Sequence, residues 1–160
     1  MINPDRLHRL SFFGFFDEDR RNAVAEVAEE EEVPQGITLF EEKQPANALY
    51  YLVEGYIDLY QRTFDTYYPS LSKDLLVGAV HPHEIFGLSA MVEPYTYRAT
   101  ARTAQPCNYV KFDGPRLRAL IEEDCRLGYI FMRQVTFALR DRLNDTRVEL
   151  AAAWVESQKK

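Results

Sequence analysis

Apolar and polar residues are distributed along this chain in three different ways, and each predicts a different kind of structure. Residues 5–30 carry apolar residues at helical spacing, interrupted by an aromatic patch around Gly14, so we expect N-terminal helices there, with Asp17 as an N-cap. The glutamates at residues 29–32 are expected to end the last of these helices in solvent.

From residue 33 to residue 112 the pattern changes to short apolar or alternating stretches separated by Pro, Gly, Asn and His, which is typical of short strands. So many short antiparallel strands need closure or a second sheet to hide their edges. The sequence therefore predicts an α+β fold built on a β-roll, that is, a jelly roll or double-stranded β-helix. We expect strands near residues 37–40, 48–53, 56–63, 74–80, 98–104 and 106–112.

The last part, residues 113–156, is expected to form a short helix followed by a long one. Asp113, Gly114 and Pro115 are typical of a helix start, and Asp124 can cap a second helix that runs from residue 125 to about residue 155. Its apolar residues step by four and therefore drift around the helix, so one side can cover the roll while another meets a partner helix. A helix folded wholly against its own domain is the alternative. They are Leu127, Phe131, Val135, Leu139 and Leu143, continued by Leu150 and Trp154, with Ile130 and Ala138 alongside.

Length and charge agree with one domain covering residues 1–160, divided into N-terminal helices (1–32), β-roll (33–112) and C-terminal helices (113–156). The chain has 19 basic and 25 acidic residues, a net charge of −6. Residues 1–110 hold 9 basic and 17 acidic groups (9 − 17 = −8), and residues 111–160 hold 10 and 8 (+2). Because this acidity repels a phosphate backbone, we expect no nucleic-acid partner.

No apolar stretch approaches the roughly 20 residues that a membrane span requires, so we expect no membrane insertion.

The two cysteines, Cys107 and Cys125, lack the spacing of a zinc or redox pair. Two free thiols without a signal peptide suit the cytoplasm better than an exported protein.

One segment carries the features of an anion site. Around Phe86 and Gly87 a strand is expected to end in one short helical turn, and a strand opened by a single arginine, Arg98, follows after a loop. Free amides at the start of such a turn, together with a nearby guanidinium, suit a phosphate group. A solvated Arg98 without any ligand is the alternative.

The order of these residues resembles the cyclic nucleotide-binding domains of the catabolite activator protein (CRP/FNR) superfamily. Their phosphate-binding cassette runs Phe-Gly-Glu-x-Ala-Leu, then a variable loop, then Arg-x-Ala, and Phe86, Gly87, Ala90 and Arg98 fall on this pattern. The resemblance extends to Pro34, Gly36 and Leu39 in the first strand, to residues 48–55, and to the closing helix pair. It implies a β-roll between N-terminal and C-terminal helices. It also implies a ligand site formed by Phe86, Gly87, Leu88, Ser89, Ala90, Met91, Arg98, Ala99 and Thr100.

The cassette departs from the family pattern at one residue that matters for affinity. Leu88 stands where the family has a glutamate that accepts from the ribose 2′-hydroxyl, and the loss of one charged hydrogen bond costs about 1.5–3 kcal/mol, or about 10- to 150-fold in affinity. Lys43 and His83 stand at two family glycine positions. Ser89 or Thr100 could offer a neutral hydroxyl, and Tyr95 or Tyr97 could stack on a base.

Catalytic and metal chemistry find little support in the sequence. His81 and His83 are two residues apart, but a catalytic metal site needs at least three protein ligands, and a polar turn explains them as well. Ser89 lacks the second glycine of a nucleophile elbow, and Cys107 has no neighbouring histidine. We therefore expect no enzyme, no catalytic or metal-binding residue and no cofactor.

Two functions remain. The first is a cytoplasmic sensor that binds a small anion, by resemblance cAMP or cGMP, and signals through its C-terminal helices to an effector protein. The second is a ligand-free, dimeric interaction module with a vestigial pocket. In both, the long helix is expected to form a homodimer. Because the sequence ends at Lys160, we expect no helix-turn-helix domain to follow.

Overall fold

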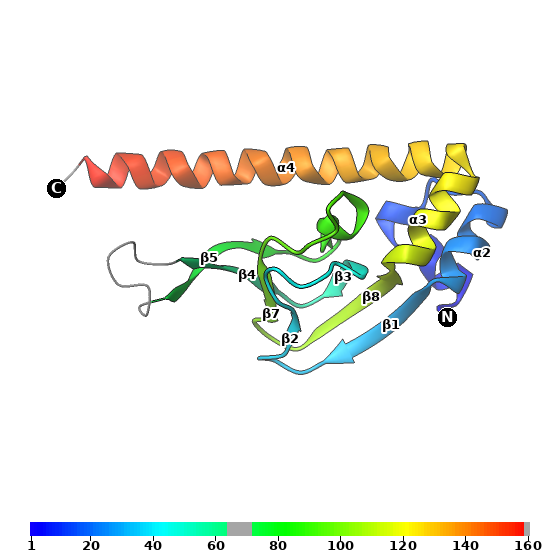
Figure 1. Cartoon of the computed structure of the whole chain (residues 1–160), viewed down its shortest axis with the longest axis horizontal. Coiled ribbons are helices and arrows are strands. Elements are labelled where there is room, and N and C mark those ends of the chain that lie inside the picture. Colours follow the sequence, from blue (N-terminus) through cyan, green and yellow to red (C-terminus); the bar gives the residue numbers. More distant parts are fainter. Residues whose placement is uncertain (64–71, 159–160) are drawn as a thin grey trace.

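The computed structural model describes residues 1–63 and 72–158. In these residues eight strands form the centre of the fold, with helical segments before, between and after them (Figure 1). The strands are β1 (Ala28–Val33), β2 (Thr38–Phe40), β3 (Ala48–Glu54), β4 (Ile57–Thr63), β5 (Lys73–Val80), β6 (Ile85–Phe86), β7 (Thr100–Thr103) and β8 (Cys107–Asp113). The helices are α1 (Pro4–His8), α2 (Glu18–Glu26), α3 (Gly114–Glu123) and α4 (Cys125–Ser157), with the short 3₁₀ helices η1 (Ser11–Phe13) and η2 (Leu88–Met91).

The strands form two four-stranded antiparallel sheets, ordered β1-β8-β3-β6 and β2-β7-β4-β5. Strands far apart in sequence are neighbours in both sheets, as Ala28 opposite Phe112 and Tyr60 opposite Thr100 illustrate. This arrangement, with helices at both ends of the chain, confirms the α+β β-roll that the alternation of short apolar stretches predicts.

The glutamate run was expected to end a helix, and that prediction is wrong: it forms most of strand β1. Pairing with β8 provides two partners for one of its carboxylates, because Glu31 accepts from the Tyr109 hydroxyl (2.7 Å) and lies 3.7 Å from the Lys111 ammonium. Glu30 pairs with Arg6 of α1 at 2.9 Å. The roll therefore begins at Ala28, five residues before the expected boundary.

Strand β3 is buried on both faces, which explains its unbroken apolar sequence. Tyr50 points into the roll, where its ring stacks on Phe86 with centroids 4.9 Å apart. Tyr51 points the other way, toward Phe13 of η1 (5.7 Å between centroids). The core therefore has two layers, one inside the roll and one between the roll and the helices.

Helix α4 is one continuous helix of 33 residues, about 50 Å long at about 1.5 Å per residue. Its buried apolar residues lie in its first third, where Leu127, Phe131 and Val135 pack against the domain. Beyond them the helix runs over the roll and past the β4–β5 hairpin (Figure 1). In the described residues no helix has both the length and the apolar character of a membrane span.

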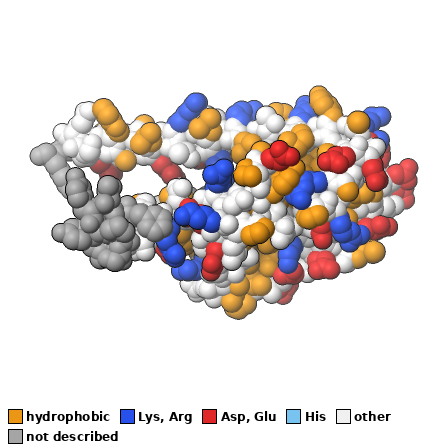
Figure 2. Space-filling model, viewed as in Figure 1, with side chains coloured by type: hydrophobic (Ala, Val, Ile, Leu, Met, Phe, Trp, Pro, Cys, Tyr) orange, Lys and Arg blue, Asp and Glu red, His pale blue; other side chains and the backbone are white. Residues whose placement is uncertain are grey.

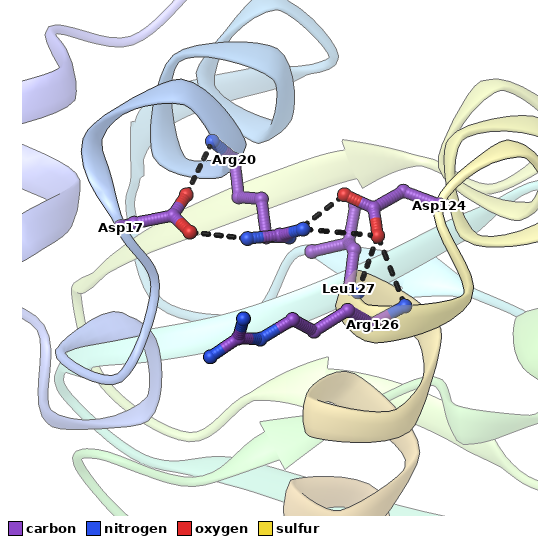
Figure 3. A network of polar contacts seen from close by, with 5 residues as sticks. All are labelled: Asp17, Arg20, Asp124, Arg126 and Leu127. Carbon is purple, nitrogen blue, oxygen red and sulfur yellow. Dashed lines mark hydrogen bonds and ion pairs between the residues drawn. The ribbon is translucent and has the colours of Figure 1, made fainter.

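The start of α4 is fixed to α2 by a polar network. Asp17 caps α2 and pairs with Arg20, and Arg20 in turn reaches Asp124, the N-cap of α4 (Figure 3). The Asp124 carboxylate also accepts from the backbone amides of Arg126 (2.9 Å) and Leu127 (3.0 Å). Both caps, and the Asp113 cap of α3, confirm the expected helix starts.

Candidate functional site

The short helical turn expected after Phe86 and Gly87 is present, and its backbone requires glycine. Gly87 ends β6 with φ of +71° and is the N-cap of η2. A Cβ at this position would lie 3.0 Å from the Tyr50 ring and 3.1 Å from the Ala48 carbonyl oxygen. Gly87 therefore allows the turn to pass close to β3, and the first amides of η2 lack partners within the turn.

The η2 turn is held from α3. Ala90 is fully buried, and its carbonyl oxygen accepts a hydrogen bond from the Arg118 guanidinium. The same guanidinium lies over the Tyr95 ring, 4.0 Å from its centroid. Arg118 thus connects the turn, the loop after it and the first C-terminal helix. Its role could not be predicted from the sequence, because an arginine on the polar side of an amphipathic helix carries no distinguishing signal.

Arg98 lies at the surface, two residues before β7, so the expected strand begins later than predicted. Its guanidinium has no hydrogen bond or ion pair with any other described residue. An unpaired surface guanidinium keeps all its donors available to an anion.

The remaining predicted site residues differ in how accessible they are. Leu88, Ser89, Met91, Ala99 and Thr100 are half-buried, whereas Phe86 is fully buried and belongs to the core. The Thr100 hydroxyl already accepts from the Glu42 amide at 3.0 Å. The structure thus brings Phe86, Gly87 and η2 into one turn, while ligand binding by these residues stays a prediction.

Neither of the two tyrosines expected to stack on a base has a free ring. Tyr97 is buried and stacks on Phe40, with centroids 3.8 Å apart, and its hydroxyl donates to the Ala48 carbonyl (2.7 Å). Tyr95 lies under Arg118. Each ring therefore already has a stacking partner within the protein.

The two residues at the family glycine positions keep the backbone conformation that glycine favours. Lys43 has φ of +71° and His83 has φ of +74°. The Nδ1 atom of His83 lies 3.3 Å from the Tyr51 hydroxyl, which is also 3.2 Å from the Ser11 hydroxyl. At His83 these side-chain contacts accompany a backbone conformation that is costly for a residue other than glycine.

A large cavity lies between α4 and the roll, next to the cassette rather than within it. Its volume is about 720 Å³, and neither η2 nor Arg98 lines it. One side is formed by α4 from Gln134 to Glu149, and the other by η1, β5 and the turn from His81 to Ile85. We call this cavity the α4 groove.

Arg142 connects α4 across this groove to the strand that enters the cassette. Its guanidinium donates to the Ile85 carbonyl (3.3 Å) and lies 4.0 Å from the Glu84 carboxylate. Burial lowers the pKa of Arg142, while attraction to Glu84 and Asp145 opposes that shift. Arg118 and Arg142 thus hold the cassette at both ends, each from a different C-terminal helix.

The cysteines and histidines do not assemble a reactive site in the described part of the chain. Cys107 is buried, and its thiol donates to the carbonyls of Tyr56 and Gln105, while Cys125 is exposed. Burial raises the pKa of the Cys107 thiol, which disfavours the thiolate needed for nucleophilic attack. His81 packs against the Tyr56 ring.

Comparison with known proteins places these features in a family. The model of the cyclic nucleotide-binding domain matches residues 30–124, which include the whole roll after its first two residues. A crystal structure of a protein from Geobacter metallireducens GS-15, described as a cyclic nucleotide-binding protein, is 33% identical with a TM-score of 0.76. That alignment covers 89% of this chain and 99% of the other. The chain belongs to the cyclic nucleotide-binding domain family.

More distant structures share the fold. A cyclic nucleotide-binding domain from Methylobacillus flagellatus KT has a TM-score of 0.73 at 14% identity, covering 93% of this chain and 80% of that one. The sensor domain of the transcriptional regulator DNR from Pseudomonas aeruginosa has a TM-score of 0.65 at 17% identity, covering 88% and 95%. A comparison with curated proteins finds no match.

Proposed function

We propose that this domain is a regulatory sensor that binds a cyclic nucleotide or a similar small anion and signals through α3 and α4. The ligand's phosphate lies against the amides of η2 and the Arg98 guanidinium, within the set Phe86, Gly87, Leu88, Ser89, Ala90, Met91, Arg98, Ala99 and Thr100. The regulatory domain of Toxoplasma gondii PKA, crystallised with cAMP, shares this fold at 19% identity with a TM-score of 0.58, over 73% of this chain and 42% of that one.

The observation that carries the proposal is the double attachment of the cassette. Arg118 of α3 holds Ala90, and Arg142 of α4 holds Ile85. A ligand shifts a conformational equilibrium only when it binds one state better than the other. Because both helices contact the cassette, a ligand that moves η2 changes the free energy of the helix positions directly.

Calorimetric titration with cAMP and cGMP tests this proposal on the wild type and on Arg98→Ala. We expect saturable binding that Arg98→Ala removes, because the free guanidinium supplies the cation for the phosphate. Arg102→Ala is the matched control, since Arg102 carries the same charge four residues away on β7. Binding that is equally sensitive to both changes, or unaffected by Arg98→Ala, contradicts the proposed site.

A ligand-free interaction module is the second candidate, and Leu88 favours it, because an apolar side chain accepts no hydrogen bond from a ribose. The acidic lining of the α4 groove also favours it. In that case no nucleotide binds at any concentration tested, and wild type and Arg98→Ala have the same melting temperature with and without nucleotide.

We further propose that the domain acts as a cytoplasmic homodimer that transmits its state to an effector protein. The apolar residues Met132, Leu139, Leu143 and Leu150 are exposed on α4, between 38% and 62%. Their steps of seven, four and seven residues match the repeat of about 3.5 residues that joins helices in coiled coils. We call this stripe the α4 seam, and we propose that it packs against the same seam of a second copy.

A further inference from the structure

Strand β5 is a free sheet edge without the usual protection. Within the described residues it pairs with β4 only, at the end of its sheet. Its residues Leu75, Leu76 and Val77 are 49%, 60% and 45% exposed. Proteins normally protect such edges with charges, and strand β1 at the edge of the other sheet carries four glutamates. From Leu75 to Val80, β5 has no charged residue.

This free edge lies on one side of the α4 groove. Val77, Gly78 and Ala79 line the groove opposite Thr146, Val148 and Glu149 of α4. Figure 1 shows β5 as the strand of its sheet that lies toward α4. The groove runs along α4 from Gln134 to Glu149, about 22 Å at about 1.5 Å per residue, which an extended peptide of about seven residues spans.

The helix side of the groove is acidic. Asp141, Asp145 and Glu149 follow one another at intervals of four residues and therefore lie on one face of α4. Figure 2 shows the hollow beneath the C-terminal part of α4, with acidic side chains on that side of the helix. With Glu84 the lining has four carboxylates and a single guanidinium, that of Arg142.

The carboxylates near the free edge are only partly compensated by cations, since Arg142 attracts Asp145 without forming an ion pair with it. Asp145 and Glu149 form no hydrogen bond or ion pair with other described residues, and like charges four residues apart on a helix destabilise it. Arg142 is directed to Ile85 and Glu84 at the other end of the groove. The open part of the groove therefore favours a cationic occupant.

The spacing of these acids matches that of a strand. Carboxylates four residues apart on a helix are about 6 Å apart along its axis, and alternate side chains of a strand are about 6.6 Å apart. A peptide paired with β5 that carries a basic residue at every second position would thus place each basic side chain near one carboxylate.

We propose that the α4 groove binds an extended basic segment of a partner protein, which adds to the sheet as a fifth strand beside β5. Backbone hydrogen bonds to β5 provide affinity, and the acidic face of α4 selects alternating Lys or Arg. Bound in this way, the segment holds the free half of α4 at a fixed distance from the roll.

Fluorescence anisotropy with a labelled seven-residue peptide of alternating lysine and valine tests this proposal. We expect saturable binding that is at least about tenfold weaker for the counterpart with glutamate in place of lysine, since each lost charge-assisted contact costs about that factor. A version of the lysine peptide with alternate backbone amides methylated should lose binding, because it cannot pair with β5.

Two double variants locate the site on the protein. The first variant combines Asp145→Asn with Glu149→Gln and should weaken binding about tenfold or more. The control combines Glu122→Gln with Glu123→Gln. It removes two acids from the exposed side of α3 and should leave peptide binding unchanged. Circular dichroism verifies that both variants are folded. Arg98→Ala should also have no effect, which separates this proposal from that for the nucleotide site.

Hydrogen exchange in the complex gives an independent readout. We expect the peptide to slow amide exchange in β5. It should not slow exchange to a comparable extent on the α4 seam. Absence of peptide binding, equal binding of the glutamate peptide, protection confined to the seam, or peptide-induced pairing of two copies through β5 would each overturn the proposal.

Discussion

The Nε atom of Arg20 lies 2.7 Å from the Oδ2 atom of Asp124, so that the N-cap of the longest helix is held by a residue of α2 (Figure 3). One carboxylate therefore has two functions, capping α4 through the amides of Arg126 and Leu127 and joining α4 to the N-terminal helices. The direction in which α4 leaves the domain depends on this contact and on the buried residues Leu127 and Phe131.

The first prediction concerns acid stability. Hydrogen bonds from the Leu127 amide and from Arg20 lower the pKa of Asp124, and the Arg20 amide and guanidinium lower that of Asp17. A carboxyl group with a lowered pKa stabilises the fold above its ordinary pKa of 3.8, and this stability is lost as the pH falls through the folded-state value. Chemical unfolding followed between pH 6 and about pH 2 should therefore show a smaller loss for Asp124→Asn than for wild type. Glu123→Gln is the neighbouring control, and an unchanged pH profile for Asp124→Asn would contradict the role of the charge.

The second prediction separates the two sides of α4. Phe131→Ala should lower the free energy of unfolding by about 3–5 kcal/mol, because it empties a fully buried aromatic site, and should leave self-association of the folded protein intact. Leu143→Glu should weaken self-association and leave the free energy of unfolding nearly unchanged, since Leu143 is 50% exposed on the α4 seam. Sedimentation equilibrium and urea unfolding measure the two quantities.

Asn144→Glu is the matched control for Leu143→Glu, because it introduces the same charge one residue away from the seam. A wild-type protein that stays monomeric at high micromolar concentration would contradict the proposed homodimer.

The third prediction restores the acceptor that the cassette lacks. Leu88→Glu should raise affinity for cAMP by about 10- to 150-fold, the value of one charged hydrogen bond to the ribose. Leu88→Gln, which offers a neutral acceptor of similar shape, should give a smaller gain. Calorimetry measures both, and a Leu88→Glu variant that binds no better than wild type would show that the ribose does not reach this residue.

The fourth prediction concerns Arg118 as a positioning residue. Arg118→Gln removes the charge that lies over Tyr95 and weakens the bond to the Ala90 carbonyl, so amides of η2 should exchange about tenfold faster. Arg116→Gln, two residues earlier on α3, serves as the control. Equal exchange in both variants, with global stability unchanged, would mean that Arg118 does not hold the turn.

Local sequence signals predicted much of this fold because short-range interactions produce them. Asp17, Asp113 and Asp124 each accept a hydrogen bond from an amide two or three residues ahead, so the helix starts could be placed without tertiary information. The short apolar stretches of the roll and the four-residue steps of α4 likewise reflect the geometry of single elements.

The glutamates at residues 29–32 show where local signals are insufficient to predict secondary structure. A run of four glutamates has no strand pattern, and it pairs only because β8, nearly 80 residues later, supplies Tyr109 and Lys111 opposite it. The contacts of Arg118 and Arg142 could not be predicted from the sequence either. Arg118 contacts a residue 28 positions earlier in the chain, and Arg142 contacts one 57 positions earlier.

The sequence by itself determined the β-roll, the turn at Gly87 and the long final helix, because periodicity, helix caps and a glycine at the end of a strand act within a few residues. Only the tertiary structure decided that Phe131 is buried and Leu143 exposed. It also decided that, among the described residues, Arg98 has no partner and a free strand edge faces an acidic helix. Those outcomes depend on which surfaces remain uncovered after distant strands pair, and no short stretch of sequence contains that information.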